Sequence, residues 1–363
     1  MQRVLLLGGG HAHVQVVAEA ARLSAAGAAV TLVSDSRLTP YSGMLPGVLA
    51  GRREAGAMMI DLAALCARHG VDFIEARVEG FDRAARAARL ADGRTIAGDL
   101  VAFDLGAVPD LSAIEGAAAH ALPVKPIAAF LDAHARLVGA MERGEVRSAV
   151  VVGAGAAGVE LACALRARAG AAPRLTLLDP GLPLSSLNAG VRRRAARALA
   201  RRAIEARSGR AVAVTAAGVV LADGAAIAAD AVLLTGLARP PRWFARDGLP
   251  VTEDGSLATR DTLQLVGEDD LFATGDCGHV VGQTYPKAGV FAVRQGPVLA
   301  RNLLARLERR APERWRAQSA FLVLLDLGDG TALGGRGGRL AFEGRWARAL
   351  KDRIDEGFVA RFR

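Results

Sequence analysis

The chain has 363 residues and a formal net charge of +9, and 52% of its residues are hydrophobic. This length allows two domains and a small third one. The positive charge comes almost entirely from arginines spread along the sequence, without a basic stripe interleaved with aromatic residues. We therefore expect no nucleic-acid partner, whereas an anionic ligand or membrane surface is compatible with the charge.

The apolar stretches and the cysteines exclude several classes of protein. No run of eighteen apolar residues is free of charge, and the apolar N-terminal run ends in glycines without a basic segment before it. We expect neither a membrane-spanning helix nor a signal peptide. Cys66, Cys163 and Cys277 are far apart and form no CxxC pair, which argues against a metal site or a local redox disulfide and fits a cytoplasmic protein.

The N-terminal stretch predicts a strand, a glycine-rich turn and a helix. Residues 4–7 are apolar, as in a buried parallel strand, and apolar residues recur at helical spacing over residues 13–22. The turn between them would place backbone N–H groups and the positive end of a helix dipole against a diphosphate. An ordinary strand–turn–helix unit is the alternative. The candidate turn consists of Gly8, Gly9, Gly10, His11 and Ala12.

This first turn departs from the GxGxxG pattern at the third glycine, where His13 stands. That glycine serves the packing of helix against strand, so phosphate binding survives the change. The next expected strand, residues 29–33, ends at Ser34 and Asp35, and the Asp35 carboxylate is available to a ribose hydroxyl. The loop over residues 40–47, rich in Pro and Gly, is either a connector or part of a ligand site.

The next part of the chain alternates between short strands and helices. In chain order, we expect a helix over 60–69, strands at 71–74, 78–81, 88–90 and 95–97, a buried strand over 100–107 that contains Gly106, and a helix near 127–142.

A complete GxGxxG motif follows the apolar strand 149–152 and opens a helix. A lone motif of this kind is weak, but between a strand and a helix it indicates dinucleotide binding. The next strand ends at Asp179, whose carboxylate would bind ribose hydroxyls and repel a 2′-phosphate, favouring NADH. Arginines at 192–194 would soften this preference, so NADPH stays an alternative. The motif comprises Gly153, Gly155, Ala156, Ala157 and Gly158.

The remaining elements end in a small separate unit. In chain order, we expect a helix over 189–207, strands at 211–214, 218–221 and 231–234 before Gly236, a strand at 270–273 before Gly275 and Asp276, a helix over 289–307, strands at 321–326, 332–335 and 340–342, and a helix from 344.

Two nucleotide-binding turns and a Gly-Asp pair after a late strand resemble the pyridine nucleotide-disulfide oxidoreductase superfamily, on the side of the type II NADH dehydrogenases. Residues 8–14, 41–47, 287–296 and 343–355 are similar to the flavoprotein module often fused to selenide, water dikinase (selenophosphate synthase). The resemblance implies an α/β fold with two Rossmann-like domains and a small C-terminal α+β unit. The FAD-binding domain would comprise residues 1–110 and 245–315, the NAD(P)H-binding domain 111–244, and the C-terminal unit 316–363.

The resemblance also implies roles for individual residues. Asp276 would hydrogen-bond FAD near its diphosphate, and the start of helix 289–307 would direct its positive end at the flavin. Glu160 would lie near the contact between nicotinamide and flavin as a catalytic acid, and a solvated helix acid is the alternative. Tyr41 would be the second catalytic residue, in a loop that lines the flavin ring. Further cofactor-binding residues would be Ser42, Gly43, Met44, Lys287, Ala288, Gly289 and Val290.

Together these observations lead us to expect an FAD-dependent NAD(P)H dehydrogenase that passes electrons to a small-molecule acceptor such as a quinone. The alternative is a non-catalytic flavin or nucleotide sensor, or an accessory partner in selenophosphate synthesis. We expect Cys277 to be a buried packing residue. In the last helix, apolar residues recur at every fourth position from Trp346 to Phe362 among arginines, which favours a core or homodimer surface over peripheral attachment to the inner face of a membrane.

Overall fold

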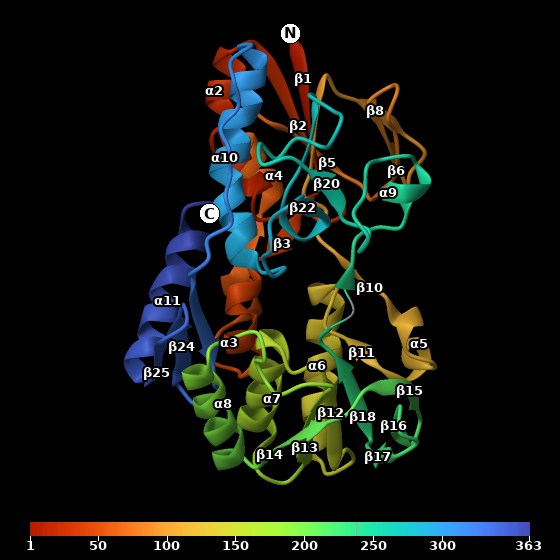
Figure 1. The fold of residues 1–363 in the computed structure, drawn as a ribbon, viewed down its shortest axis with the longest axis vertical. Helices are drawn as coiled ribbons and strands as arrows, with labels where there is room; N and C mark the ends of the chain where they lie inside the picture. The colour runs from red at the N-terminus through yellow and green to blue at the C-terminus, as the bar shows by residue number, and fades with distance from the viewer. Residues whose placement is uncertain (237) are drawn as a thin grey trace.

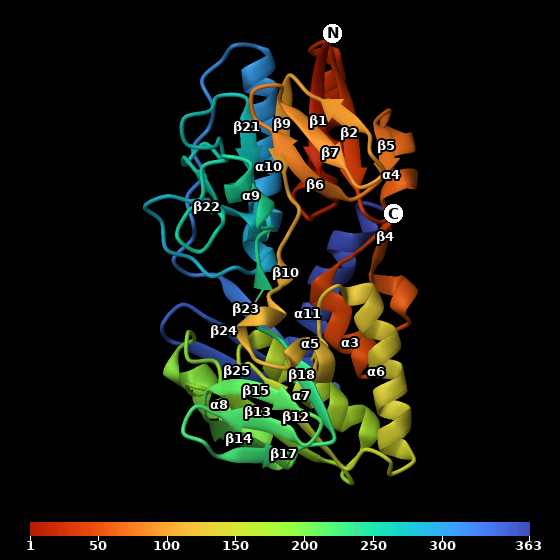
Figure 2. The same ribbon diagram turned by 90° about the vertical axis from the view of Figure 1, so that its right-hand side faces the viewer.

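The computed structural model describes residues 1–236 and 238–363, which form two lobes with the C-terminal unit beside them (Figure 1). Each lobe is built on a five-stranded parallel sheet. We call these the upper and the lower sheet after their positions in Figure 2. The α/β architecture with two Rossmann-like sheets is therefore confirmed.

The sheet of the upper lobe in Figure 1 contains strands from both segments, 1–110 and 245–315, that the resemblance assigns to one domain. Its strand order is β21 (Leu271–Ala273), β9 (Leu100–Phe103), β1 (Gln2–Leu7), β2 (Ala28–Ser34) and β5 (Asp72–Glu75). Val4 and Leu6 enter the main core on one face, whereas Leu5 and Leu7 enter a second core on the other. Both faces are covered, which explains the uninterrupted apolar run in β1.

The helices α1 (His13–Ala18), α4 (Leu62–His69) and α10 (Gly289–Leu307) pack together at the upper sheet. A small antiparallel sheet of β6 (Val78–Asp82), β7 (Ala87–Leu90) and β8 (Thr95–Ala97) contributes to the second core, as does α9 (Trp243–Arg246). The other elements of this lobe are α2 (Ala20–Ala25), β3 (Leu38–Pro40), η1 (Ser42–Met44), α3 (Leu45–Leu49), η2 (Ala55–Met58), β4 (Met59–Asp61), β20 (Leu257–Thr259), η4 (Gly275–Cys277) and β22 (Gly278–Val280).

The lower sheet has the order β11 (Leu122–Pro123), β18 (Ala231–Leu234), β12 (Ser148–Val152), β13 (Arg174–Asp179) and β14 (Ile204–Ser208). Its helices are α6 (Ile127–Glu142), α7 (Ala156–Ala169) and α8 (Ala189–Arg201). A three-stranded sheet of β15 (Ala211–Thr215), β16 (Gly218–Leu221) and β17 (Ala226–Ala228), with α5 (Ala117–His120) and η3 (Leu111–Ala113), completes the lobe. The short strands β10 (Val108–Pro109) and β19 (Ala238–Arg239) pair where the chain passes between the lobes.

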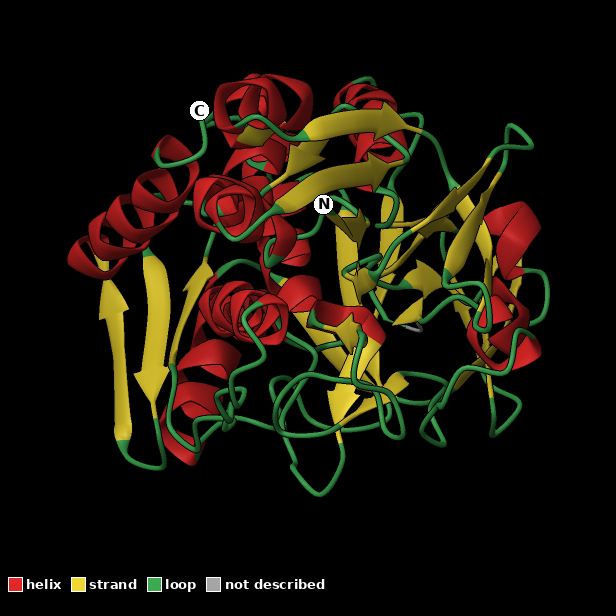
Figure 3. Ribbon diagram, turned by 90° about the horizontal axis from the view of Figure 1, so that it is seen from above, coloured by secondary structure: helices red, strands yellow, loops and turns green. Residues whose placement is uncertain are grey.

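The C-terminal unit consists of the antiparallel strands β23 (Leu322–Asp326), β24 (Ala332–Arg336) and β25 (Leu340–Gly344) and the helix α11 (Arg345–Ala360). It stands at one side of the molecule when seen from above (Figure 3). The sheet contacts α7 and α8 of the lower lobe, and α11 contacts the same sheet and η1 of the upper lobe. Within the described residues, no helix has the length and apolar character needed to cross a membrane.

Three expectations about the elements were wrong. The first helix is interrupted at Glu19, where α1 ends and α2 begins. The helix expected over 189–207 ends at Arg201, and Ile204–Ser208 instead forms the edge strand β14. The loop over 40–47 contains the helical segments η1 and α3.

The apolar stripe expected along the last helix is also not a single buried face. Phe358 and Phe362 are buried, but Trp346 is 57% exposed and Ile354 is 45% exposed. A spacing of four residues drifts around a helix that has 3.6 residues per turn, so the stripe leaves the core toward the N-terminal end of α11.

Candidate functional site

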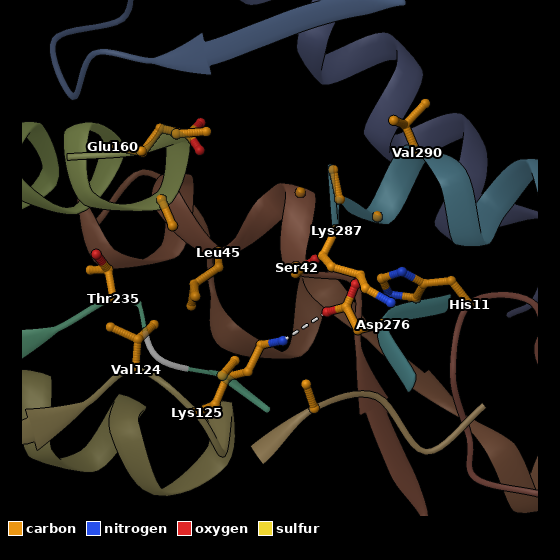
Figure 4. Close-up of a pocket in the computed structure, with 18 of the residues that line it drawn as sticks. His11, Ser42, Leu45, Val124, Lys125, Glu160, Thr235, Asp276, Lys287 and Val290 are labelled. Carbon is orange, nitrogen blue, oxygen red and sulfur yellow. Dashed lines mark hydrogen bonds and ion pairs between the residues drawn. The ribbon is translucent and has the colours of Figure 1, made fainter. Parts of the chain in front are cut away.

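A cavity of about 1660 Å³ lies where the two lobes and the C-terminal unit meet. Its walls come from the second glycine-rich turn, the loop 41–46, the start of α10, β23 and α11. Figure 4 shows Glu160 on one side of this cavity and His11, Lys287 and Asp276 together on the opposite side. Sites for single small molecules usually enclose roughly 300–1,000 Å³, so this cavity has room for more than one ligand group.

The second glycine-rich turn is open toward the cavity. A Cβ atom added to Gly155 would meet no described atom within 4 Å, whereas one added to Gly158 would lie 1.7 Å from the Gly153 carbonyl oxygen. The Asp179 carboxylate accepts a hydrogen bond from the Ala154 N–H at 2.8 Å and lines the same cavity. Gly158 thus serves close packing of helix on turn, and Gly155 leaves the start of α7 accessible to an anionic ligand.

The first turn is closed by a buried carboxylate that the sequence reasoning missed. Asp104, which follows β9, accepts hydrogen bonds from the N–H groups of Ala12 at 2.9 Å and His13 at 3.2 Å. A Cβ atom on Gly10 would lie 2.3 Å from this carboxylate. Burial raises the pKa of Asp104 to about 6, although the hydrogen bonds from His13 and Ala12 oppose the shift. Part of the positive end of α1 is therefore already occupied by a protein group.

His13 explains how the first turn dispenses with its third glycine. The ring is buried, and its Nδ1 lies 2.7 Å from the Gly8 carbonyl oxygen. Burial lowers the pKa of His13 to about 4. The neutral His13 imidazole therefore connects α1 to the end of β1 by a hydrogen bond, whereas a glycine at this position would allow the two backbones to pack directly.

The opposite side of the cavity carries a cluster of polar groups around Asp276. The Lys125 ammonium lies 3.1 Å from an Asp276 carboxylate oxygen, and the Lys287 ammonium donates to the Gly278 carbonyl oxygen at 2.6 Å. Burial lowers the pKa of Lys287. Gly289, the first residue of α10, lies next to the His11 ring, and α10 has no side-chain cap at its start. Uncapped N–H groups of a long helix favour negative charge in this part of the cavity.

Glu160 belongs to a buried polar network that links α7 to the C-terminal unit. It accepts a hydrogen bond from the Asp326 N–H at 2.8 Å, and burial raises the pKa of Glu160 to about 7 even though the Lys351 charge acts against this shift. The Lys351 ammonium donates to the Gly43 carbonyl oxygen at 2.6 Å and to Asp355 at 2.9 Å. Burial alone would lower the pKa of Lys351, but Glu160 and Asp355 raise it. Close to neutral pH, Glu160 can therefore hold or release a proton at the cavity wall.

Tyr41 lies at the junction of this network with an aromatic cluster. Its ring stacks on Phe358 with a centroid distance of 4.6 Å, and the His11 ring lies 5.1 Å from Tyr41. Burial and the neighbouring Asp355 carboxylate raise the pKa of Tyr41, so the phenol keeps its proton. Tyr41, Phe358, His11 and Asp355 all line the cavity.

The structure brings most of the residues expected at the site together around one cavity. Those that line it are His11, Tyr41, Ser42, Gly43, Gly153, Gly155, Ala156, Ala157, Gly158, Glu160, Asp179, Gly236, Asp276, Lys287, Ala288, Gly289 and Val290. Those that do not are Gly8, Gly9, Gly10, Ala12, Ser34, Asp35, Met44, Gly106 and Gly275. Among the latter, Asp35 is exposed, Ser34 is buried beneath Gly9, and Met44 is buried in the main core.

The three cysteines are free and buried. Cys277, next to Asp276, contacts the Thr274 carbonyl oxygen through its Sγ atom at 3.3 Å, and burial raises the pKa of its thiol to about 12. A protonated, enclosed thiol is a packing residue, in line with the sequence-based expectation. In the part of the chain that the structure describes, no cluster of His, Cys, Asp and Glu side chains is suited to hold a metal ion.

Two Rossmann-like sheets, each with a glycine-rich turn after one of its strands, define a two-domain α/β fold. The chain belongs to the pyridine nucleotide-disulphide oxidoreductase family, whose profile matches residues 2–296.

Individual relatives are more distant. An NADH dehydrogenase-like protein of Mycobacterium tuberculosis strain H37Rv is 30% identical over 239 residues, which cover 61% of this chain. The match spans 59% of the length of that relative. The same values hold for the NADH dehydrogenase-like protein of strain CDC 1551.

Solved structures share all or most of the fold. The sulfide:quinone oxidoreductase of Aquifex aeolicus superposes with a TM-score of 0.83 at 17% identity, covering 100% of this chain and 92% of the other. A ferredoxin reductase of Rhodopseudomonas palustris gives a TM-score of 0.76 at 21% identity, covering 92% of this chain and 82% of the other. At these identities the likeness concerns the fold alone.

Proposed function

We propose that the protein is an FAD-dependent NAD(P)H dehydrogenase that prefers NADH and reduces a quinone-type acceptor. The observation that carries the proposal is the single cavity that joins the open turn at Gly155, the polar cluster around Asp276 and the proton-holding Glu160. The relatives named as NADH dehydrogenase-like and the sulfide:quinone oxidoreductase with the same fold support this class of reaction. The FAD domain would comprise residues 1–110 and 245–315, and the NAD(P)H domain 111–244.

The residues around the cavity fit both nucleotides. The accessible start of α7 and the Asp179 carboxylate suit a dinucleotide with free ribose hydroxyls, whereas a 2′-phosphate would meet a like charge. Asp276 and the uncapped start of α10 suit the polar part of a flavin nucleotide. Once bound, FAD and NADH would supply the redox chemistry, in which NADH, one proton and a quinone give NAD⁺ and hydroquinone.

A direct test compares the two nicotinamide cofactors. Protein supplied with FAD should oxidise NADH in the presence of a soluble quinone, and it should do so with a higher kcat/KM than for NADPH. A preparation that binds FAD and oxidises neither cofactor would reject the proposal in favour of a sensor or an accessory partner in selenophosphate synthesis.

The chain's own part in the reaction is to hold the ligands and to supply a proton. Glu160 is protonated below a pKa of about 7, and the Asp326 N–H holds its carboxyl group at the wall. A neutral Glu160 can give its proton to a reduced acceptor, whereas an ionised one cannot. General acids of this kind contribute on the order of a hundredfold or more to a reaction rate.

Glu160→Gln should therefore lower turnover with quinone by about a hundredfold at pH 6. In the unchanged protein, turnover should fall as the pH rises through about 7, because Glu160 loses its proton. The variant should lack this decline. Steady-state rates across the pH range measure both effects, and the rate of flavin reduction by NADH without acceptor serves as the control. An unaltered pH profile in the variant would exclude Glu160 as the proton donor.

Asp104→Asn should strengthen FAD binding at neutral pH by about tenfold, because it removes a negative charge from the turn expected to bind the diphosphate. The amide oxygen can still accept from the Ala12 and His13 N–H groups. Since burial raises the pKa of Asp104 to about 6, FAD affinity of the unchanged protein should rise as the pH falls through this value. Fluorescence titration of the apoprotein with FAD measures the affinity of the variant and the pH dependence of the affinity of the unchanged protein. Weaker binding in the variant would show that the Asp104 charge supports the site.

A further inference from the structure

Two arginines, Arg294 and Arg336, line neighbouring cavities next to the C-terminal unit. Arg294, on the second turn of α10, lines the main cavity. Arg336, the last residue of β24, lines a smaller cavity of about 340 Å³, and both cavities are bounded by Phe321 and Val323. Burial lowers the pKa of Arg294, and the positive charge of Arg336 lowers it further.

Neither charge is neutralised by the protein. Among the described residues, no carboxylate lies within ion-pair distance of Arg294 or Arg336, and the buried Nη1 atom of Arg294 has no hydrogen-bond partner. Other arginines on α10 are paired, since Arg301 lies 2.6 Å from Glu313 and Arg306 lies 2.8 Å from Asp270. Buried donors are normally satisfied, and two like charges repel each other. An anionic group bound there would give the Arg294 Nη1 atom a hydrogen-bond partner and would reduce the repulsion between the two positive charges.

The walls of this part of the cavity are apolar. The apolar residues that line it include Val290 and Val293 of α10, Leu322 and Leu324 of β23, and Ile354 of α11. In the antiparallel register Leu322 pairs with Arg336, so the two side chains lie on the same face of the C-terminal sheet. This part of the cavity therefore has apolar walls and arginine side chains at one end. A ligand that matches it has a flat apolar ring and one anionic substituent.

We propose that the electron acceptor is an organic anion, with a carboxylate or sulfonate held by Arg294 and Arg336 while its reducible ring lies between α10 and β23. The proposal rests on the proposed dehydrogenase function and specifies the substrate class of the same cavity. The overall reaction is unchanged, because NADH, one proton and the quinone ring still give NAD⁺ and the hydroquinone, and the anionic group takes no part in electron transfer.

The kinetic test compares naphthoquinone sulfonate with its uncharged parent, naphthoquinone, in the FAD-loaded protein. Arg294→Gln should lower kcat/KM for the sulfonate by on the order of ten- to a hundredfold and leave kcat/KM for the parent within about twofold. Arg336→Gln should shift the same ratio in the same direction. Because one pair of acceptors is used with every variant, differences in their reduction potentials cancel. Equal losses for both acceptors, or no loss for the sulfonate, would overturn the proposal.

A binding experiment separates this proposal from the dehydrogenase function. Naphthalene sulfonate, which is not reducible, should bind the FAD-loaded protein in calorimetry, and Arg294→Gln should weaken its binding by about tenfold or more. Arg197→Gln provides the matched control, because Arg197 is an exposed arginine of α8 that lines neither cavity. If NADH fails to reduce the protein but this binding pattern holds, the anion site stands and the dehydrogenase function fails. Equal affinities of the unchanged protein and Arg294→Gln would overturn the anion site alone.

Discussion

Replacing Gly155 with valine is expected to abolish reduction by NADH while the fold and the bound flavin persist. The backbone of Gly155 has a φ of −69°, which valine adopts without strain, and no described atom lies within 4 Å of the added Cβ position. The new side chain therefore projects into the cavity, where the diphosphate of NADH would approach the start of α7. Displacement of a bound reactant by about 1 Å can cost on the order of a hundredfold in rate, and we expect at least this loss. Stopped-flow absorbance of the flavin measures this rate.

Gly56→Val is the matched control for this experiment. Gly56 is exposed, a Cβ atom there also meets no described atom within 4 Å, and the residue does not line the cavity. The control should reduce at the rate of the unchanged protein. If Gly155→Val also reduced at that rate, NADH would have to bind elsewhere, and the assignment of the lower lobe would fail.

Replacing Asp276 with alanine is expected to leave the purified protein without flavin. The carboxylate faces the cavity beside Lys125 and next to the start of α10, where it can accept a hydrogen bond from the flavin nucleotide. Its loss removes that acceptor and leaves the Lys125 ammonium without its partner. Hydrogen bonds to charged groups contribute about 1.5–3 kcal/mol, which corresponds to an affinity loss of about ten- to a hundredfold. The ratio of flavin absorbance to protein absorbance after gel filtration reports this loss.

Asp72→Ala serves as its control, since Asp72 is an exposed carboxylate of β5 in the same lobe and lines no part of the cavity. It should retain flavin in full. A full flavin spectrum in Asp276→Ala, at unchanged thermal stability, would show that FAD does not depend on this side chain.

Features encoded in one short stretch could be predicted from the sequence. The helices 127–142 and 289–307 have the bounds expected from their periodicity, and the complete GxGxxG motif lies between a strand and a helix as expected. Both depend on neighbours within a few residues, because helical periodicity and the approach of a helix to its own turn are local properties.

The end of α8 shows where local pattern is insufficient. Residues 202–207 are mostly alanine, arginine and glutamate, which favour a helix, but Ala203 has a φ of +50°, which ends the helix. The chain then pairs in parallel with β13 through residues 204–208. The hydrogen bonds and burial gained at the sheet edge outweigh helical propensity, and they depend on a strand elsewhere in the sequence.

The pKa values and charged neighbours of the site residues could likewise not be predicted from the sequence. Glu160 could be identified from its motif, but its elevated pKa depends on burial beneath β23 and α11, which lie far along the chain. Asp104 reaches the first turn only because β9 and β1 are neighbours in the sheet. Arg294 lies on α10 and Arg336 at the end of β24, so any interaction between them depends on how these distant elements fold. Pairwise contacts between distant segments leave no spacing signal in a single sequence.

The most direct test of the dehydrogenase function is an anaerobic visible spectrum of the FAD-loaded protein, recorded before NADH, after NADH and after a soluble quinone. We predict that the flavin bands bleach on addition of NADH and return when the quinone is added. Flavin bands that persist in excess NADH would contradict the proposed function. The absence of flavin bands even with added FAD would contradict the assignment of the upper lobe.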